Sequence, residues 1–245
     1  MASRSPVAYL MEKVTTFFRR KMLPPDDTRA WMSFVNPGML DPGNVYLFDY
    51  CIRHLSSNAP IVEIGSFCGL SLNHISYFLR KYGCPNLLFS SDAWEFEGFT
   101  RGAEFLDGTE LGAIPYQQHV IETFRTNVSF FSGDRLPYHI RLASDAFFQS
   151  WEECEEVTDF FGRTIKLGGA ISLAYIDGDH SYEQSRRDFV NVDRHLQIGG
   201  FVIFDDSADW TDWGSHRAAR EVALLPNYEI VHRAPNYCLR KTAVS

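Results

Sequence analysis

The chain has 245 residues, of which 45% are hydrophobic and 15% aromatic, enough for one sizeable core in a single α/β domain. Its formal charge is −8, and the only basic cluster is the short run at 19–21, which argues against a nucleic-acid partner. No apolar run approaches the ~20 residues of a membrane span and the amino terminus lacks a signal-peptide core, so we expect a cytoplasmic protein without a membrane span.

The first part of the chain predicts helices. Residues 7–22 have the pattern of an amphipathic helix, which the turn signal at 24–27 ends, and a second helix is predicted around residues 45–55. We therefore assign residues 1–58 to an amino-terminal helical cap and residues 59–245 to the α/β domain.

From residue 60 onward, apolar runs of four to six residues alternate with helical stretches, which is typical of buried parallel strands joined by crossover helices. Two extended segments near the end of the chain predict an antiparallel hairpin. The fold we expect is a Rossmann-like three-layer α/β/α sandwich with a mostly parallel seven-stranded sheet. The predicted strands are 61–64, 87–91, 139–142, 173–176, 201–204, 228–232 and 237–240. Residues 95–116 form a long loop, either an active-site lid or a surface insertion.

The five cysteines are scattered along the chain and include no CxxC pair. Neither zinc spacing nor a disulfide framework is therefore supported. We expect buried free thiols.

A glycine turn follows the first predicted strand. Gly65 allows a sharp bend close to a ligand, and Gly69 allows tight packing at the start of a helix. Glu63 is an acid inside an apolar strand, which is costly unless it has a partner, and a cationic ligand would be one. The spacing E-x-G-x-x-x-G resembles motif I of the class I methyltransferases. That resemblance implies that Glu63, Gly65, Ser66, Gly69 and Ser71 hold the methionine part of S-adenosylmethionine.

Acids also follow the next two strands. Asp92 can accept both ribose hydroxyls of a nucleoside lying across the sheet, although a turn or cap is the alternative reading. The methyltransferase resemblance implies that Ser144, Asp145 and Ala146 contact adenine, with Asp145 accepting from its exocyclic amine. Capping of the following helix competes for Asp145.

Three carboxylates are expected to meet at one edge of the sheet. Asp177 follows one strand, and Asp205 and Asp206 follow the next strand along the chain. A right-handed crossover places these two strand ends side by side. Like charges this close repel unless one is protonated or a cation binds, and oxygen ligands select Mg²⁺ or a similar hard cation. A cluster of caps and turns is the alternative.

The segments I-D-G-D-H-S-Y-E and G-G-F-V-I-F-D-D resemble those of metal-dependent O-methyltransferases, in particular the macrocin and mycinamicin sugar O-methyltransferases, and more distantly the catechol and caffeoyl-CoA enzymes. The resemblance covers roughly residues 60–240. In catechol-type enzymes a lysine base follows the first metal acid by three positions, and here His180 holds that position. A neutral imidazole can take a proton near physiological pH, with Asp179 or the metal as alternatives.

A polar loop after the metal acids contains Trp210, Trp213 and His216. Large aromatic residues usually go to the core, so these two tryptophans either stack on an acceptor or pack against the cap helices. The resemblance implies methyl transfer from S-adenosylmethionine to a hydroxyl of a small molecule, a sugar or glycosylated natural product, with catalytic roles for His180, Asp177 and Asp179. A same-fold enzyme with other chemistry, such as hydroxylation, and a non-catalytic cofactor-binding subunit stay open, as does a homo-oligomer.

Overall fold

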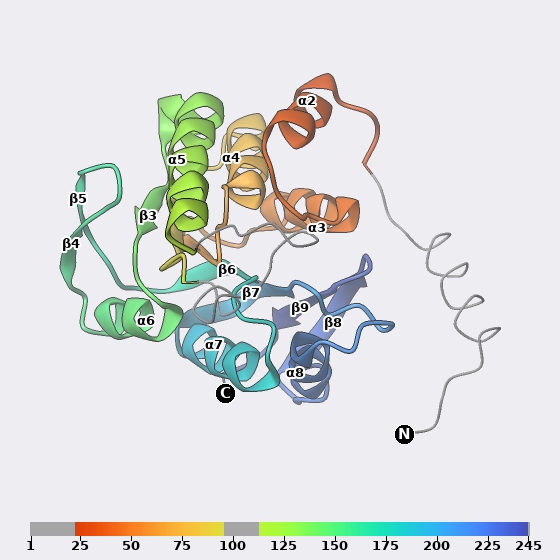
Figure 1. Ribbon diagram of the computed structural model, residues 1–245. Helices are drawn as coiled ribbons and strands as arrows, with labels where there is room; N and C mark the ends of the chain where they lie inside the picture. Colours follow the sequence, from red (N-terminus) through yellow and green to blue (C-terminus); the bar gives the residue numbers. More distant parts are fainter. Residues whose placement is uncertain (1–22, 96–112, 245) are drawn as a thin grey trace.

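A seven-stranded sheet forms the centre of the computed structural model, which describes residues 23–95 and 113–244 (Figure 1). The strand order is β3-β2-β1-β6-β7-β9-β8. The first five strands in this order are parallel, and β9 and β8 form an antiparallel hairpin at one edge. The strands are β1 (Ile61–Ile64), β2 (Leu88–Ser91), β3 (Tyr138–Ile140), β6 (Ile171–Ile176), β7 (Leu196–Phe204), β8 (Tyr228–Arg233) and β9 (Tyr237–Lys241). The predicted sandwich, its mostly parallel sheet and its terminal hairpin are confirmed.

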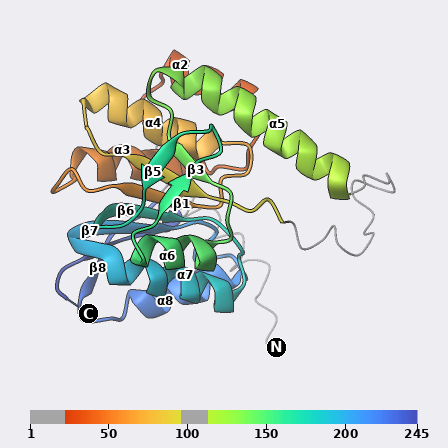
Figure 2. The same cartoon turned by 90° about the vertical axis from the view of Figure 1, so that its left-hand side faces the viewer.

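Helices cover both faces of the sheet (Figure 2). One face carries α2 (Asp27–Val35), α3 (Pro42–Arg53), α4 (Leu70–Tyr82) and α5 (Ala113–Ser132), which the short 3₁₀ helix η2 (Gly133–Arg135) follows; the other carries α6 (Ser144–Glu152), α7 (Tyr182–His195) and α8 (Gly214–Val222). Each face has its own apolar layer because strand side chains alternate. In β6, Leu173 and Tyr175 join the layer beneath α3 and α4, whereas Ala174 and Ile176 join the layer beneath α6 and α7.

Side-chain caps explain where several helices begin. Asp26 accepts a hydrogen bond from the backbone N–H of Arg29 at the start of α2, and Ser181 does the same for α7. Helix α3 begins three residues earlier than predicted, because Asp41 caps it and Pro42 occupies its first turn.

Three strands have an end that lies two or more residues from its predicted position. The backbone N–H of Leu142 bonds to the carbonyl of Ile140, so the chain already turns there and β3 ends two residues early. Strand β6 begins two residues before its predicted start, and β7 begins at Leu196, five residues before its own, because the two pair through an irregular stretch that includes Gly199 and Gly200. These positions lack the continuous apolar run from which strands were predicted.

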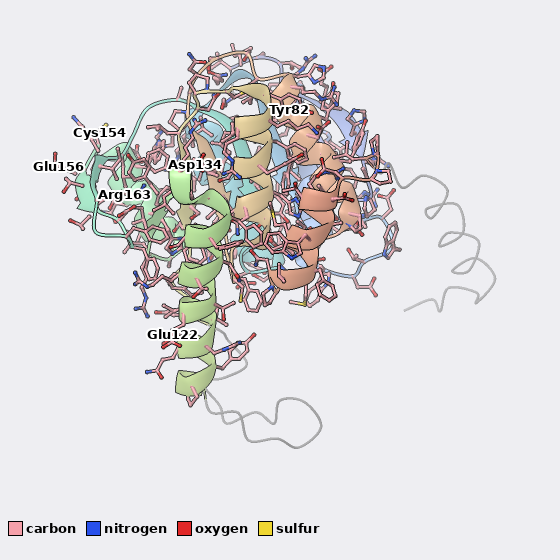
Figure 3. The ribbon with its side chains drawn as sticks, turned by 90° about the horizontal axis from the view of Figure 1, so that it is seen from above. Tyr82, Glu122, Asp134, Cys154, Glu156 and Arg163 are labelled. Carbon is pink, nitrogen blue, oxygen red and sulfur yellow. The ribbon has the colours of Figure 1, made fainter. Side chains whose placement is uncertain are left out.

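A second, two-stranded sheet was missed altogether. It consists of β4 (Glu156–Thr158) and β5 (Thr164–Lys166), and its side chains are largely exposed. Figure 3 shows Cys154, Glu156 and Arg163 together in this part of the molecule. Within the hairpin loop Arg163 pairs with the buried Asp159, and its guanidinium also donates to the carbonyl oxygens of Leu136 and Pro137, which ties the loop to the body. Because these two strands contain few apolar residues, no apolar pattern in the sequence predicts them.

The cysteines are unpaired, as predicted, but they are not all buried. Cys51, Cys68 and Cys238 lie in the interior, Cys84 is half-buried, and Cys154 is exposed. Among the described residues no helix is long and apolar enough to cross a membrane. The predicted helix at 7–22 lies outside the described residues, as do residues 96–112 of the predicted loop at 95–116. The last four residues of that loop are helical instead, because α5 begins at Ala113.

Candidate active site

A cavity of about 820 Å³ lies at the carboxyl ends of the parallel strands. Parallel strands end at a common edge, and in open α/β sheets this edge is where ligands bind. The loop of residues 37–40, the ends of β1, β2, β3, β6 and β7, and the first turns of α7 line it. Its volume lies within the range of small-molecule and cofactor sites.

The glycine turn after β1 forms one wall of the cavity. Gly65 has φ +81°, and a Cβ added there would lie 2.0 Å from the carbonyl oxygen of Asp177. Gly69, with φ +85°, caps α4, and a Cβ on it would lie 2.6 Å from Val128 Cγ2. Both glycines are therefore required by close approaches, one between neighbouring strand ends and one between α4 and α5.

Asp92 stabilises this turn. Its Oδ2 accepts hydrogen bonds from the backbone N–H groups of Ser66 and Phe67 at 2.9 and 3.0 Å, and its Oδ1 accepts from the N–H of Trp94 at 2.7 Å. Burial raises the pKa of Asp92, and these three donors oppose the rise. The predicted turn role is therefore present, and the carboxylate also lines the cavity.

Glu63 is completely buried in β1, beside the cavity rather than on its wall. Neither carboxyl oxygen has a hydrogen-bond partner within normal distance among the described residues. Burial raises the pKa of Glu63 to about 8, and the nearby hydroxyls of Ser66 and Ser71 offset part of that rise. Both serines line the cavity, so Glu63 lies behind the surface that a ligand would touch.

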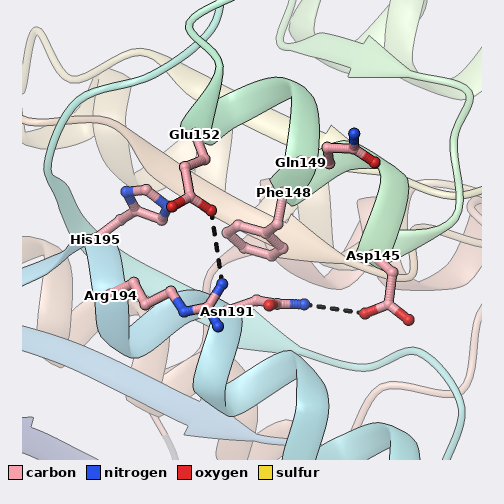
Figure 4. Close-up of a pocket in the computed structure, with 7 residues that line it drawn as sticks. All are labelled: Asp145, Phe148, Gln149, Glu152, Asn191, Arg194 and His195. Carbon is pink, nitrogen blue, oxygen red and sulfur yellow. Dashed lines mark hydrogen bonds and ion pairs between the residues drawn. The ribbon is translucent and has the colours of Figure 1, made fainter.

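The three residues predicted to contact adenine, 144–146, do not all face the large cavity. Ser144 and Asp145 line the large cavity, whereas Ala146 is not part of its wall. Asp145 also faces a second, smaller cavity between α6 and α7, where its Oδ1 accepts from Asn191 Nδ2 at 3.0 Å (Figure 4). The capping alternative for Asp145 is wrong, because α6 begins at Ser144 and Asp145 lies in its first turn.

The carboxylates after β6 and β7 meet as predicted. Ile176 and Phe204 are register partners, so Asp177 and Asp205 follow them on adjacent strands, and Asp206 comes next with φ +46°. Burial and the neighbouring Asp205 raise the pKa of Asp177 well above its usual value. The pKa of Asp205 is raised by burial as well.

His180 lies between two of these acids. Its Nδ1 is 2.9 Å from Asp206 Oδ2, and its Nε2 is 3.6 Å from Asp177 Oδ1. Hydrogen bonds to both carboxylates raise the pKa of His180 to about 10. The sequence predicts a neutral imidazole near physiological pH; this environment instead favours the charged ring, because the two acids stabilise it.

Two asparagines that the sequence analysis did not single out hold Asp205. Its Oδ1 accepts from Asn44 Nδ2 at 2.5 Å and from Asn236 Nδ2 at 2.6 Å, and Asn44 also donates to the Tyr175 hydroxyl. Both amides are buried. They come from α3 and from the hairpin between β8 and β9, so the cap helix and the edge strands both reach the site.

As ligands, the carboxylate oxygens of Asp177, Asp205 and Asp206 fit a hard divalent cation. Burial and the neighbouring acids raise the pKa values of Asp177 and Asp205, so a cation would stabilise their charged forms. Within residues 23–95 and 113–244, however, no three His, Cys, Asp or Glu side chains are already arranged around a metal position. The ring of His180 lies between Asp177 and Asp206 instead.

The candidate acceptor residues also separate. Trp213 lines the cavity, is 54% exposed and makes an edge-to-face contact with His180 at 5.2 Å. Trp210 and His216 do not belong to the cavity wall, and His216 Nε2 lies 3.6 Å from Asp209. Asp179 is on the wall, where its Oδ1 accepts from the N–H of Ser181 in a tight turn.

Helix α7 contributes two further wall residues that were missed, Gln184 and Asp188. The buried stripe of this helix contains Ser185 and Asp188 beside Phe189 and Val192. The sequence pattern that could have indicated Asp188 is a polar residue at a core position of an amphipathic helix.

Comparisons with known proteins give one family match and several structural matches. A family model described as a methyltransferase domain matches residues 62–207, which contain the glycine turn and all the acids of the cavity. No curated protein matches the chain by sequence.

Solved structures share the fold at low identity. An O-methyltransferase from Bacillus cereus in complex with SAH has a TM-score of 0.58 at 15% identity, covering 94% of this chain and 97% of that one. TomG from Streptomyces achromogenes, an O-methyltransferase of tomaymycin synthesis solved with SAM, has a TM-score of 0.55 at 12% identity, covering 98% and 100%. CalS11, a TDP-rhamnose 3'-O-methyltransferase of calicheamicin biosynthesis, has a TM-score of 0.53 at 17% identity, covering 98% and 96%.

Proposed function

Because the chain belongs to the methyltransferase-domain family, we propose that it transfers the methyl group of S-adenosylmethionine to a hydroxyl of a small molecule. The observation that carries the proposal is the single cavity wall on which the glycine turn, Asp92 and the cluster of Asp177, His180 and Asp206 all lie. A donor held at the turn would point its sulfonium toward the cluster, where an acceptor hydroxyl can meet it.

The charge of the wall supports a cationic donor. Among the described residues that line the cavity, none is lysine or arginine, and His180 is the one basic side chain. The carboxyl side chains of the wall are those of Asp92, Glu95, Asp145, Asp177, Asp179, Asp188, Asp205 and Asp206. A sulfonium ion is attracted by such a wall.

The same charge restricts the acceptor. A phosphate or carboxylate would be repelled by the acidic wall, so the acceptor we propose is a neutral or cationic hydroxyl compound. CalS11 is named for a TDP-linked sugar; for this chain a sugar in glycosidic form, without a diphosphate, fits better. Trp213 and the apolar residues Met39 and Leu40 on the wall suit a sugar face or an apolar aglycone.

In the reaction, the acceptor oxygen attacks the methyl carbon, the C–O bond forms as the C–S bond breaks, and the hydroxyl proton must leave. His180 is the proposed proton acceptor, since it lies on the wall between Asp177 and Asp206 and next to Trp213. Asp179, three residues from the end of β6, is the alternative. Much of the acceleration would come from holding donor and acceptor in line.

A divalent cation remains part of the proposal. Asp177, Asp205 and Asp206 are the residues that would hold it, and it would supply charge neutralisation and a lowered pKa for the acceptor hydroxyl. Before His180 can accept a proton, the negative charge of the acids around it has to be offset, because that charge keeps its pKa near 10.

Methyl transfer from radiolabelled donor to a panel of glycosides tests the proposal, with chelator and with added Mg²⁺. Transfer that stops with chelator and returns with Mg²⁺ supports both the activity and the metal. Transfer that survives chelation supports the activity and removes the metal. Donor binding without transfer to any hydroxyl compound favours a binding subunit or a different chemistry on the same fold.

A further inference from the structure

A polar cluster from helix α7 and the start of α6 forms the cavity wall next to the end of β3. Gln184 Nε2 donates to Ser144 Oγ at 3.1 Å and to Asp188 Oδ1 at 2.9 Å. All three side chains line the cavity. The amide oxygen of Gln184 accepts from Arg187, which orients the amide so that its NH₂ group faces the other two residues. We call Ser144, Gln184 and Asp188 the α7 polar cluster.

Asp188 is the member of this cluster with unused bonding capacity. The residue is fully buried, and its Oδ2 has no hydrogen-bond partner of normal geometry among the described residues, although the nearby Ser144 hydroxyl and Gln184 amide both lower the pKa of the carboxyl. Burial raises the pKa of Asp188 to about 6, so the carboxyl is ionised at neutral pH. A buried carboxylate oxygen without a donor is unfavourable, and a ligand N–H in the cavity would remove that cost.

The strand order indicates which part of the donor would reach the cluster. The reactive acids follow β6 and β7, on one side of β1, and Asp92 follows β2, on the other side. A donor whose methyl group faces His180 and whose ribose lies at Asp92 must extend its base toward β3. Ser91 Oγ donates to the carbonyl oxygen of Leu142, which holds the ends of β2 and β3 together beside the cluster.

We propose that Asp188 accepts a hydrogen bond from the exocyclic amine of the donor's adenine and that Gln184 and Ser144 hold its carboxylate in place. This inference rests on the proposed function, since it requires an adenosyl donor in the cavity. It assigns base recognition to a residue of α7, which lies in sequence between Asp177 and Asp205, not to the segment directly after β3.

Asp145 is the competing residue, and its carboxylate is already engaged elsewhere. Its Oδ1 accepts from Asn191, and its Oδ2 lies 3.5 Å from Arg187 Nε. Figure 4 shows Asp145 and Asn191 together in the smaller cavity between α6 and α7. The Asp145 side chain is 54% exposed, so water competes for it, whereas Asp188 is fully buried.

The test compares two ligands by calorimetry: S-adenosylhomocysteine and S-inosylhomocysteine, in which a carbonyl oxygen replaces the exocyclic amine. The wild type should prefer the adenine ligand by at least about tenfold, because the oxo group would face the Asp188 carboxylate. Asp188→Asn exchanges an acceptor oxygen for an amide donor of the same shape. It should lower affinity for S-adenosylhomocysteine about tenfold and reduce the preference to about threefold or less.

Two further variants make the result specific. Glu152→Gln is the matched control, because Glu152 pairs with Arg194 on the surface and is not part of the large cavity, so it should keep the wild-type preference. Asp145→Asn tests the competitor. The inference is overturned if the wild type shows no preference, if Asp188→Asn keeps it, or if Asp145→Asn alone loses it. Failure of the wild type to bind S-adenosylhomocysteine at all would instead contradict the proposed function.

Discussion

At the scale of single residues, Glu63 carries a stability cost that depends on pH. Its folded pKa of about 8 exceeds the ordinary value of 4.5 because the carboxyl is buried. A raised pKa means that the folded state binds the proton more tightly, so the cost is absent below pH 4.5, where the carboxyl is protonated in both states, and grows as the pH rises toward 8.

Glu63→Gln should therefore flatten the pH dependence of the ligand-free protein. Between pH 6 and pH 8 the free energy of unfolding of the wild type should fall relative to that of the variant, because glutamine has no proton to lose. Urea denaturation of both proteins at the two pH values measures this. Parallel behaviour of the two would show that Glu63 does not titrate in this range.

Asp92 combines a structural and a ligand-binding role. Asp92→Ala should weaken S-adenosylhomocysteine binding by ~1–3 kcal/mol through the lost contact to the ribose. It should also lower the melting temperature, since three backbone N–H groups lose their acceptor. Asp92→Asn keeps the size and one acceptor oxygen, and should be intermediate in both measurements. Unchanged calorimetric affinity in Asp92→Ala would remove this residue from the donor site.

The proposed role of His180 as proton acceptor is tested by its alanine variant. His180→Ala should lower kcat by about 10²–10⁴ if the ring accepts the acceptor's proton, with little change in donor KM. Steady-state kinetics with a competent glycoside separate this from a positioning role. In that second case acceptor KM rises while kcat stays within about threefold, and Asp179 becomes the better candidate for the base.

At the scale of elements, helix α3 and the β8–β9 hairpin meet at Asp205. Asn44→Ala or Asn236→Ala leaves one fewer amide on the buried Oδ1 of that carboxylate. Each change should destabilise the protein by about 1–3 kcal/mol and reduce kcat, because the orientation of Asp205 loosens. Thermal unfolding and steady-state kinetics of both variants check this, and Ser57→Ala at an exposed hydrogen bond is the control. Wild-type kcat in both asparagine variants would show that the amides serve folding alone.

The sequence predicts the elements whose apolar runs are continuous and misses those whose position depends on distant partners. Strand β1 agrees with its predicted bounds residue for residue because it is fully buried. Hairpin β4–β5 has no comparable pattern, since four of its six side chains are exposed. Asn44 and Asn236 meet across 192 residues of sequence, and local spacing carries no information about that distance.

The division into a helical cap of residues 1–58 and a methyltransferase domain of residues 59–245 stays a proposal at this scale. Helix α3 packs in the same apolar layer as α4 and β1, and it supplies Asn44 to the site. We therefore propose that the cap takes part in folding the active site, which a chain starting at residue 59 tests. A stable, donor-binding protein from that shorter chain would contradict it.

At the scale of the whole molecule, the cavity is formed by residues that follow the carboxyl ends of the parallel strands. Motif spacing correctly predicted which acids gather there, because a strand–helix–strand passage brings successive strand ends together. It did not predict the environment of each group: His180 is held by two carboxylates and Asp145 is turned toward α7. Those details depend on side-chain packing between elements that are far apart in sequence.

The acidic cavity makes a further prediction about acceptors. In a matched series of methyl glycosides, a neutral sugar and an amino sugar should both serve as methyl acceptors. The corresponding uronic acid should have a kcat/KM lower by about tenfold or more. The difference should shrink in high salt because screening weakens the repulsion. Equal use of the uronic acid would contradict the charge argument while leaving methyl transfer itself intact.

The central claim is that this cavity holds an adenosyl donor, and calorimetric titration of S-adenosylhomocysteine into metal-free protein tests it most directly. The measurement requires neither the acceptor nor a metal. We predict saturable one-to-one binding in the wild type and weaker binding in Asp92→Ala. Absence of binding to folded wild-type protein at millimolar ligand would contradict the account.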